Sequence, residues 1–94
     1  MIEVAKSIIN NNRRCYICGS QINLEKHHCV FGTANRKKAD QDGLWVYLCH
    51  NCHFDVHNTN PLMKNLLQQK AQQKWQEYYG DTDAFIDRYG RSYL

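Results

Sequence analysis

A chain of 94 residues with a formal net charge of +3 and five cysteines has the size of one domain. Apolar residues make up 43% of it, which allows only a modest core, and small domains commonly need a disulfide or a metal ion for stability. An odd number of cysteines, no secretory signal pattern and no apolar run of membrane-spanning length indicate a cytosolic protein with reduced thiols. These features argue against a membrane protein and a disulfide framework, and we expect a single domain over residues 1–94.

The N-terminal half is predicted to alternate short elements with polar segments. Apolar side chains at positions 2, 4, 5, 8 and 9 predict a short helix over residues 2–10. Gly19 follows a cysteine at a point where a tight turn often needs a positive φ. In chain order we then expect a tight turn, a strand, a polar charged loop, a second strand and a short helix, over residues 14–21, 24–31, 32–43, 44–48 and 49–58.

Two further helices are predicted in the C-terminal extension, residues 60–94. Asn60 and Pro61 suit the N-cap and first turn of a long helix, and Gly80 suits its end. A last helix over about residues 83–89 should end at Gly90. The long helix carries an apolar stripe of Leu62, Met63, Leu66, Leu67, Ala71, Trp75, Tyr78 and Tyr79. We interpret the stripe as core or dimer contact rather than a ligand site, so a homodimer through the C-terminal helices is a candidate assembly.

Two Cys-x-x-Cys pairs predict a structural zinc site made of Cys15, Cys18, Cys49 and Cys52. Zinc prefers four tetrahedral ligands, and two intervening residues let both sulfurs of a pair reach one ion from a single turn. Two alternatives remain: unrelated pairs of buried cysteines, or a set in which His28 replaces Cys49. The remaining Cys29 is expected to be a buried thiol.

Four of the five histidines lie at positions 27, 28, 53 and 57, close to the two cysteine pairs. His53 and His57 are one helical turn apart and share a face. Neighbours on a strand point in opposite directions, so His27 and His28 can divide the roles of metal ligand and unligated base that a hydrolytic site needs. A purely structural use of the doublet is the alternative. His50 is expected to face outward.

Local basic clusters, rather than the overall charge, would have to bind nucleic acid. Four zinc-bound thiolates would offset much of the formal positive charge, which leaves Arg13-Arg14 and Arg36-Lys37-Lys38 as candidates. We favour Arg36, Lys37 and Lys38, because their loop follows the histidine doublet and should lie beside the metal. They are expected to contact the DNA backbone without sequence preference.

Residues 13–58 resemble the HNH endonucleases of the ββα-metal type, in their four-cysteine zinc form. The match rests on the two cysteine pairs, the His27-His28 doublet and the segment from Leu48 to His57. Small phage and prophage proteins of this kind also carry the Gly-x-x-x-Arg loop that Gly32 begins here. The resemblance implies an α+β fold in which a zinc-stapled treble-clef or ββα-metal core precedes the C-terminal helices.

The same resemblance implies a metal-dependent DNA endonuclease in the cytoplasm of a bacterial host. His28 would be the general base, and His27, His53 and His57 would bind Mg²⁺, Mn²⁺ or another divalent ion. DNA is the expected partner, and a membrane is not. The alternative is a non-catalytic, zinc-stabilised module on the same scaffold that binds nucleic acid or protein, such as a phage regulator or inhibitor.

One position departs from the family pattern. An asparagine usually precedes the second strand and braces the loop that carries the base, but Gly43 and Leu44 occupy this place. Asp42 and Asn35 are nearby. Either a neighbouring residue takes the bracing role, or catalysis is weakened or absent.

Overall fold

The computed structural model describes residues 6–10, 12–30 and 33–94. Its centre is a two-stranded antiparallel sheet of β1 (Leu24–His28) and β2 (Trp45–Cys49). The register pairs Leu24 with Cys49 and His28 with Trp45. Both strands were predicted, but β1 ends at His28, three residues earlier than expected, and residue 31 lies outside the described residues.

The segment predicted to be a polar loop over residues 32–43 is largely a helix, α1 (Thr33–Asp42), which corrects that prediction. This segment has two alanines among mostly polar side chains and no clear apolar stripe. Hydrophobic periodicity therefore could not predict a helix here. The helix is held by tertiary contacts instead: Ala39 is fully buried and Asp42 is nearly so. Gly43, with φ of 77°, ends it in the left-handed conformation.

The predicted N-terminal helix is wrong for residues 6–10, while residues 1–5 lie outside the described part of the chain. Ser7 turns the chain here, because its hydroxyl accepts hydrogen bonds from the backbone N–H groups of Ile9 and Asn10. Ile8 then donates its N–H to the carbonyl of Gly43 at 3.0 Å. This contact fastens the N-terminal segment to the turn before β2.

Three helices follow the sheet: α2 (His50–Asn58), α3 (Pro61–Tyr78) and α4 (Thr82–Tyr89). The predicted N-cap of α3 is confirmed, because the side chain of Asn60 accepts from the N–H of Met63. Asp81, which was not predicted as a cap, begins α4 in the same way by accepting from the N–H of Ala84. Gly90 ends α4 with φ of 91°.

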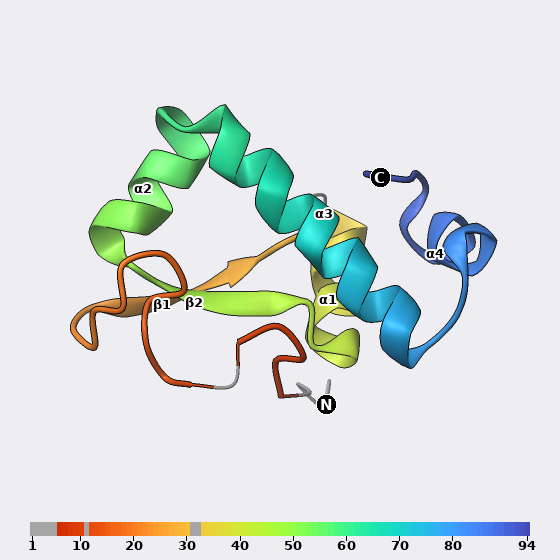
Figure 1. The fold of residues 1–94 in the computed structure, drawn as a ribbon, viewed down its shortest axis with the longest axis horizontal. Coiled ribbons are helices and arrows are strands. Elements are labelled where there is room, and N and C mark those ends of the chain that lie inside the picture. The colour runs from red at the N-terminus through yellow and green to blue at the C-terminus, as the bar shows by residue number, and fades with distance from the viewer. Residues whose placement is uncertain (1–5, 11, 31–32) are drawn as a thin grey trace.

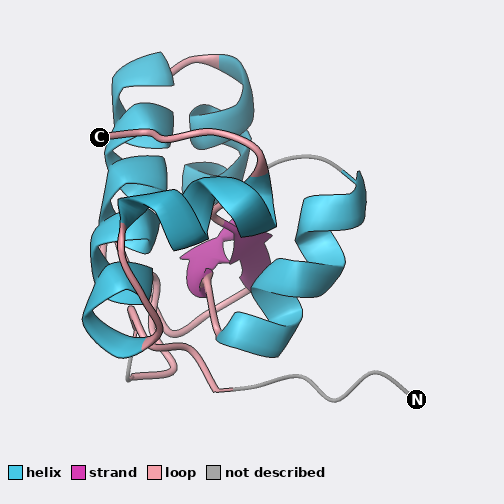
Figure 2. Cartoon of the chain, turned by 90° about the vertical axis from the view of Figure 1, so that its right-hand side faces the viewer, coloured by secondary structure: helices cyan, strands magenta, loops and turns pink. Residues whose placement is uncertain are grey.

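The strands lie between α1 on one side and α2 with α3 on the other, and α4 crosses one end (Figures 1 and 2). One apolar core joins these layers. Its largest fully buried apolar side chains come from the β1–β2 half and from the C-terminal extension alike: Leu44, Leu48, Val30, Val46, Val56, Leu67 and Phe85. Burying each large apolar side chain stabilises the fold by about 1.5–3 kcal/mol, so the extension is an integral part of this small α+β fold.

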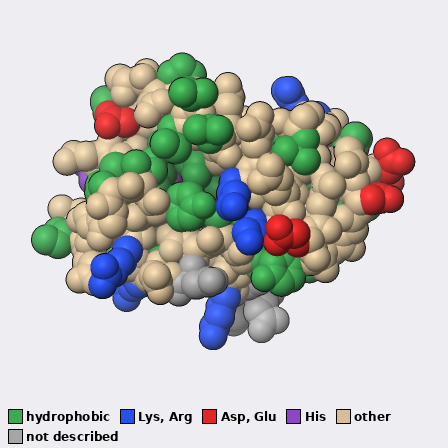
Figure 3. All heavy atoms as spheres, viewed as in Figure 1, with side chains coloured by type: hydrophobic (Ala, Val, Ile, Leu, Met, Phe, Trp, Pro, Cys, Tyr) green, Lys and Arg blue, Asp and Glu red, His purple; other side chains and the backbone are tan. Residues whose placement is uncertain are grey.

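The apolar stripe of α3 divides between the core and the surface. Leu67, Ala71 and Trp75 are buried, as the core interpretation predicts, whereas Leu62 and Leu66 are exposed. Figure 3 shows apolar side chains gathered on the α2–α3 side of one face, with lysine and arginine side chains near its middle. The homodimer stays a prediction. None of the helices in the described residues is long and apolar enough to span a membrane.

Candidate metal centres

The four predicted cysteines come together from two separate turns. Cys15 and Cys18 lie in the turn that Gly19 closes with a positive φ of 79°, as expected. Cys49 ends β2 and occupies the N-cap position of α2, and Cys52 lies in the first turn of α2. All four sulfur atoms lie within 4.8 Å of one another. Such a cluster can hold one metal ion such as zinc.

Backbone N–H donors and burial shift the pKa values of Cys15 and Cys52 in opposite directions. Burial opposes ionisation of Cys15, but N–H groups of Cys18, Cys49 and Ile17 outweigh it and lower the pKa of Cys15 to about 6. The N–H of Cys18 lies 3.4 Å from that sulfur. Burial and the neighbouring sulfurs raise the pKa of Cys52 well above its usual value. A bound cation would be needed to keep all four as thiolates.

A second cluster is made of imidazoles from β1 and α2. One ring nitrogen each of His27, His53 and His57 lies within 4.8 Å of the others. The ring of His27 packs edge-on against both partners, with centroid distances of 5.2 and 5.3 Å. The structure therefore brings together the three histidines that the sequence analysis assigned to one metal.

Burial favours the neutral form of His27 and of His57, which is the form that binds metal. His27 is 1% exposed; burial, followed by the charges of His53, His57 and His28, lowers its pKa to about 3. Burial and the nearby charges of His53, Lys64 and Arg36 also lower the pKa of His57. A neutral imidazole can coordinate a cation through its unprotonated nitrogen.

Glu25, which was not among the predicted site residues, orients this cluster. Its Oε1 lies 2.7 Å from Nδ1 of His53, and Nε2 of His53 lies 3.2 Å from Nε2 of His57. A carboxylate on one ring nitrogen fixes the tautomer that presents the other nitrogen to a metal. The sequence did hold a signal for this role. Glu25 lies two residues before His27, and residues two apart on a strand share a face.

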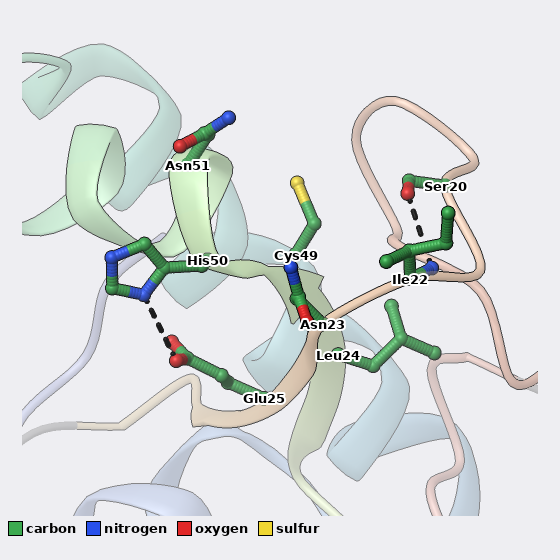
Figure 4. A pocket seen from close by; sticks show the side chains of 8 residues that line it. All are labelled: Ser20, Ile22, Asn23, Leu24, Glu25, Cys49, His50 and Asn51. Atoms are coloured by element: carbon green, nitrogen blue, oxygen red, sulfur yellow. Dashed lines mark hydrogen bonds and ion pairs between the residues drawn. The ribbon is translucent and has the colours of Figure 1, made fainter.

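The other oxygen of Glu25 contacts the exposed His50 at 3.1 Å, so His50 faces outward as predicted. Figure 4 shows this pair at the rim of a neighbouring hollow of about 480 Å³. Ser20, Asn23 and Asn51 also line that hollow, which contains none of the three clustered histidines.

His28 is separate from both clusters. Its Nε2 lies 2.8 Å from Oδ1 of Asp40 on α1, and Cys49, not His28, completes the sulfur cluster. His27 thus belongs to the histidine cluster and His28 does not, as expected for neighbouring residues on a strand. Cys29 is fully buried, which raises its pKa to about 12 and makes it an unreactive thiol, as expected.

His28 and the histidine cluster meet at one hollow of about 300 Å³. Its lining is almost entirely polar and basic: Lys26, His27, His28, Val30, Arg36, His53 and His57. Of the three predicted basic residues, only Arg36 lines it. Lys37 is exposed elsewhere on α1, and Lys38 donates to the carbonyl of Arg88 at 2.6 Å.

Comparison of the chain with protein-family models, with curated proteins and with solved structures gives no match. The resemblance to HNH endonucleases therefore stays a prediction from the residues.

Proposed function

We propose that this protein is a metal-dependent DNA endonuclease of the HNH type, built on a zinc-stapled treble-clef or ββα-metal core. The observation that carries the proposal is the shared hollow. Three clustered imidazoles and the separate, carboxylate-paired His28 line it together, and Arg36 adds a cation at its wall. Hydrolysis of a phosphodiester needs this combination of ligands, base and positive charge.

The donor set of the histidine cluster fits a divalent transition metal better than Mg²⁺. Imidazole nitrogens suit zinc, nickel and related ions, whereas Mg²⁺ prefers oxygen ligands. His27, His53 and His57 would hold the ion, and Glu25 would keep His53 in the required tautomer. When bound, the ion would polarise the scissile phosphate and stabilise the leaving 3′ oxygen.

His28 would act on the water molecule. As the water oxygen bonds to phosphorus, His28 accepts the proton that the water loses, and the bond from phosphorus to the 3′ oxygen breaks. The departing 3′ oxygen takes a proton from solvent, and His28 later returns its proton to solvent. Arg36 would hold a phosphate oxygen, since a guanidinium offers paired donors to it.

A non-catalytic, zinc-stabilised module that binds nucleic acid or protein is the second candidate, for example a phage regulator or inhibitor. Two observations favour it. Gly43 stands where the family has its bracing asparagine, and Tyr16, Ile17 and Leu66 are exposed apolar side chains. In either case the proposal keeps a reducing bacterial cytoplasm as the setting, because the cysteine cluster needs reduced thiols.

Plasmid nicking separates the two candidates. Zinc-loaded protein is incubated with supercoiled DNA and added Mn²⁺, Ni²⁺ or Mg²⁺, and wild type is compared with His28→Ala and with His50→Ala. We expect His28→Ala to lower the rate by about 10²–10⁴-fold, while the exposed His50→Ala control stays close to wild type. DNA binding without cleavage by wild type, or equal cleavage by His28→Ala, would contradict the nuclease mechanism.

A further inference from the structure

Asp40 is the side chain that faces the candidate base from α1. Its Oδ1 lies 2.8 Å from Nε2 of His28 and 2.9 Å from Nζ of Lys26, and about a fifth of each of the Asp40 and His28 side chains is exposed. Burial alone would raise the pKa of Asp40, but hydrogen bonds from Lys26 and His28 lower it below the usual value. The group is therefore a carboxylate at neutral pH.

The neighbours that the sequence suggested as braces, Asn35 and Asp42, both contact the C-terminal helices. Asn35 donates its amide to the carbonyl of Tyr89 at 3.2 Å. The carboxylate of Asp42 accepts from Trp75 and Arg88 at the opposite side of α1. Both contacts join α1 to the C-terminal helices, not to β1.

Position 43 cannot carry the family's asparagine in this fold. Gly43 has φ of 77°, and a Cβ added there would collide with the backbone carbonyl of Lys6. Backbone atoms cannot move aside as the end of a side chain can, so only glycine fits. The N-terminal segment thus occupies the space that a side chain at this position would need, and the brace has to come from another residue.

A carboxylate has acceptors only, so the hydrogen in its bond to His28 has to lie on Nε2. A neutral imidazole has one N–H, which leaves Nδ1 of His28 as the nitrogen with the lone pair. We infer that Asp40 is the positioning residue of His28: it fixes the Nε2–H tautomer and the ring orientation, so that Nδ1 is the atom that accepts the proton from water. The inference rests on the proposed function for its catalytic consequence, but the tautomer itself does not.

Lys26 has a different role in this arrangement. Its ammonium group shares Oδ1 of Asp40 with His28 and lies 4.6 Å from the ring centre of Trp45. It balances the charge of Asp40 without providing an acceptor to His28. Removal of Lys26 should therefore leave the tautomer of His28 unchanged.

The tautomer can be measured by NMR on zinc-loaded, ¹⁵N-labelled protein at about pH 9, where an ordinary histidine is neutral. Long-range correlations from the ring protons identify which nitrogen carries hydrogen, and His28→Gln assigns the signals. We expect wild type, Lys26→Met and Asn35→Ala to show His28 as the Nε2–H form. Asp40→Ala should give a mixture of tautomers, and Asp40→Asn should restore the Nε2–H form because its amide oxygen still accepts. An Nδ1–H form in wild type, or no change in Asp40→Ala, overturns the inference.

Kinetics test the consequence. Asp40→Ala should lower kcat by about 10- to 100-fold, with zinc content and affinity for the second metal unchanged, and Asp40→Asn should recover most of the loss. Full kcat in Asp40→Ala overturns the positioning role while the nuclease proposal stands. If wild type cuts no DNA with any metal, the nuclease proposal fails, and the NMR result still decides whether Asp40 fixes His28.

Discussion

The indole nitrogen of Trp75 on α3 donates a hydrogen bond of 2.8 Å to the carboxylate of Asp42, at the end of α1. The same carboxylate accepts from the hydroxyl of Tyr89 at 2.6 Å and from Nε of Arg88 at 2.5 Å, both on α4. One nearly buried carboxylate therefore joins three helices. Because Asp40 lies two residues earlier on α1, the C-terminal helices help to hold the helix that contacts His28.

Removal of this carboxylate should destabilise the whole domain. Asp42→Ala removes the acceptor that Trp75, Tyr89 and Arg88 share, and loss of one partner of a buried pair costs about 3 kcal/mol or more. Asp87→Ala, an exposed position on α4, is the matched control and should change stability by less than about 0.5 kcal/mol. Urea unfolding of the zinc-loaded proteins measures both, and equal midpoints would show that Asp42 is not a structural centre.

The cysteine cluster should bind about one equivalent of zinc. Cys18→Ser removes one of four ligands and should lower both the zinc content and the melting temperature, since metal binding is folding energy in so small a domain. Cys29→Ala is the control, because this buried thiol is not part of the cluster. Elemental analysis after dialysis gives the result; an intact fold without zinc would rule out a structural role for the metal.

The histidine cluster should bind transition metals more tightly than Mg²⁺ and should depend on Glu25. Titration calorimetry of zinc-loaded protein is expected to show Ni²⁺ or Mn²⁺ binding that His53→Ala and His57→Ala weaken strongly. Glu25→Ala should weaken it by about 10- to 100-fold, because His53 loses its orienting partner. His50→Ala removes the other partner of the same carboxylate and should have little effect. Tight Mg²⁺ binding, or indifference to Glu25, would speak against this metal site.

The basic residues of α1 should contribute unequally to DNA binding. Arg36→Ala should weaken affinity at moderate salt and lower the slope of log affinity against log salt by about one unit, because Arg36 lines the hollow. Lys37→Ala should have a smaller effect, and Lys38→Ala should mainly loosen the α1–α4 contact, since its ammonium group is bonded to the Arg88 carbonyl. Fluorescence anisotropy across a salt series measures the slopes. Equal slopes for all three variants would mean that the hollow is not the DNA-binding surface.

Alkaline pH should destabilise the fold through Tyr89. Burial, then its hydrogen bond to Asp42, raises the pKa of Tyr89 above the ordinary value of 10.0. Above about pH 10 the unfolded chain loses this proton while the folded chain keeps it, so stability falls as pH rises, by at most about 1.4 kcal/mol per pH unit. Tyr89→Phe should be less stable at neutral pH but should show a shallower alkaline slope. Melting temperatures between neutral and alkaline pH test this, with identical slopes as the contrary result.

Local rules in the sequence were sufficient for much of the site. Spacing within each Cys-x-x-Cys pair brings two sulfurs to one turn, and helical periodicity places His53 and His57 on one face. Alternation along a strand separates His27 from His28. Short-range capping chemistry likewise predicted that α3 begins after Asn60 and that α4 ends at Gly90. Each of these rules depends on residues within a few positions of one another, and so the chain alone determines them.

Contacts between distant segments decided the rest. α1 has too weak an apolar pattern to be recognised, and it is a helix because Ala39 and Asp42 are buried against other elements. That helix directs Arg36 into the hollow, turns Lys38 away and brings Asp40 to His28. Glu25 reaches His53 only because β1 packs on α2. Such pairings depend on burial across many intervening residues, which no local spacing encodes, and only the tertiary structure could assign them.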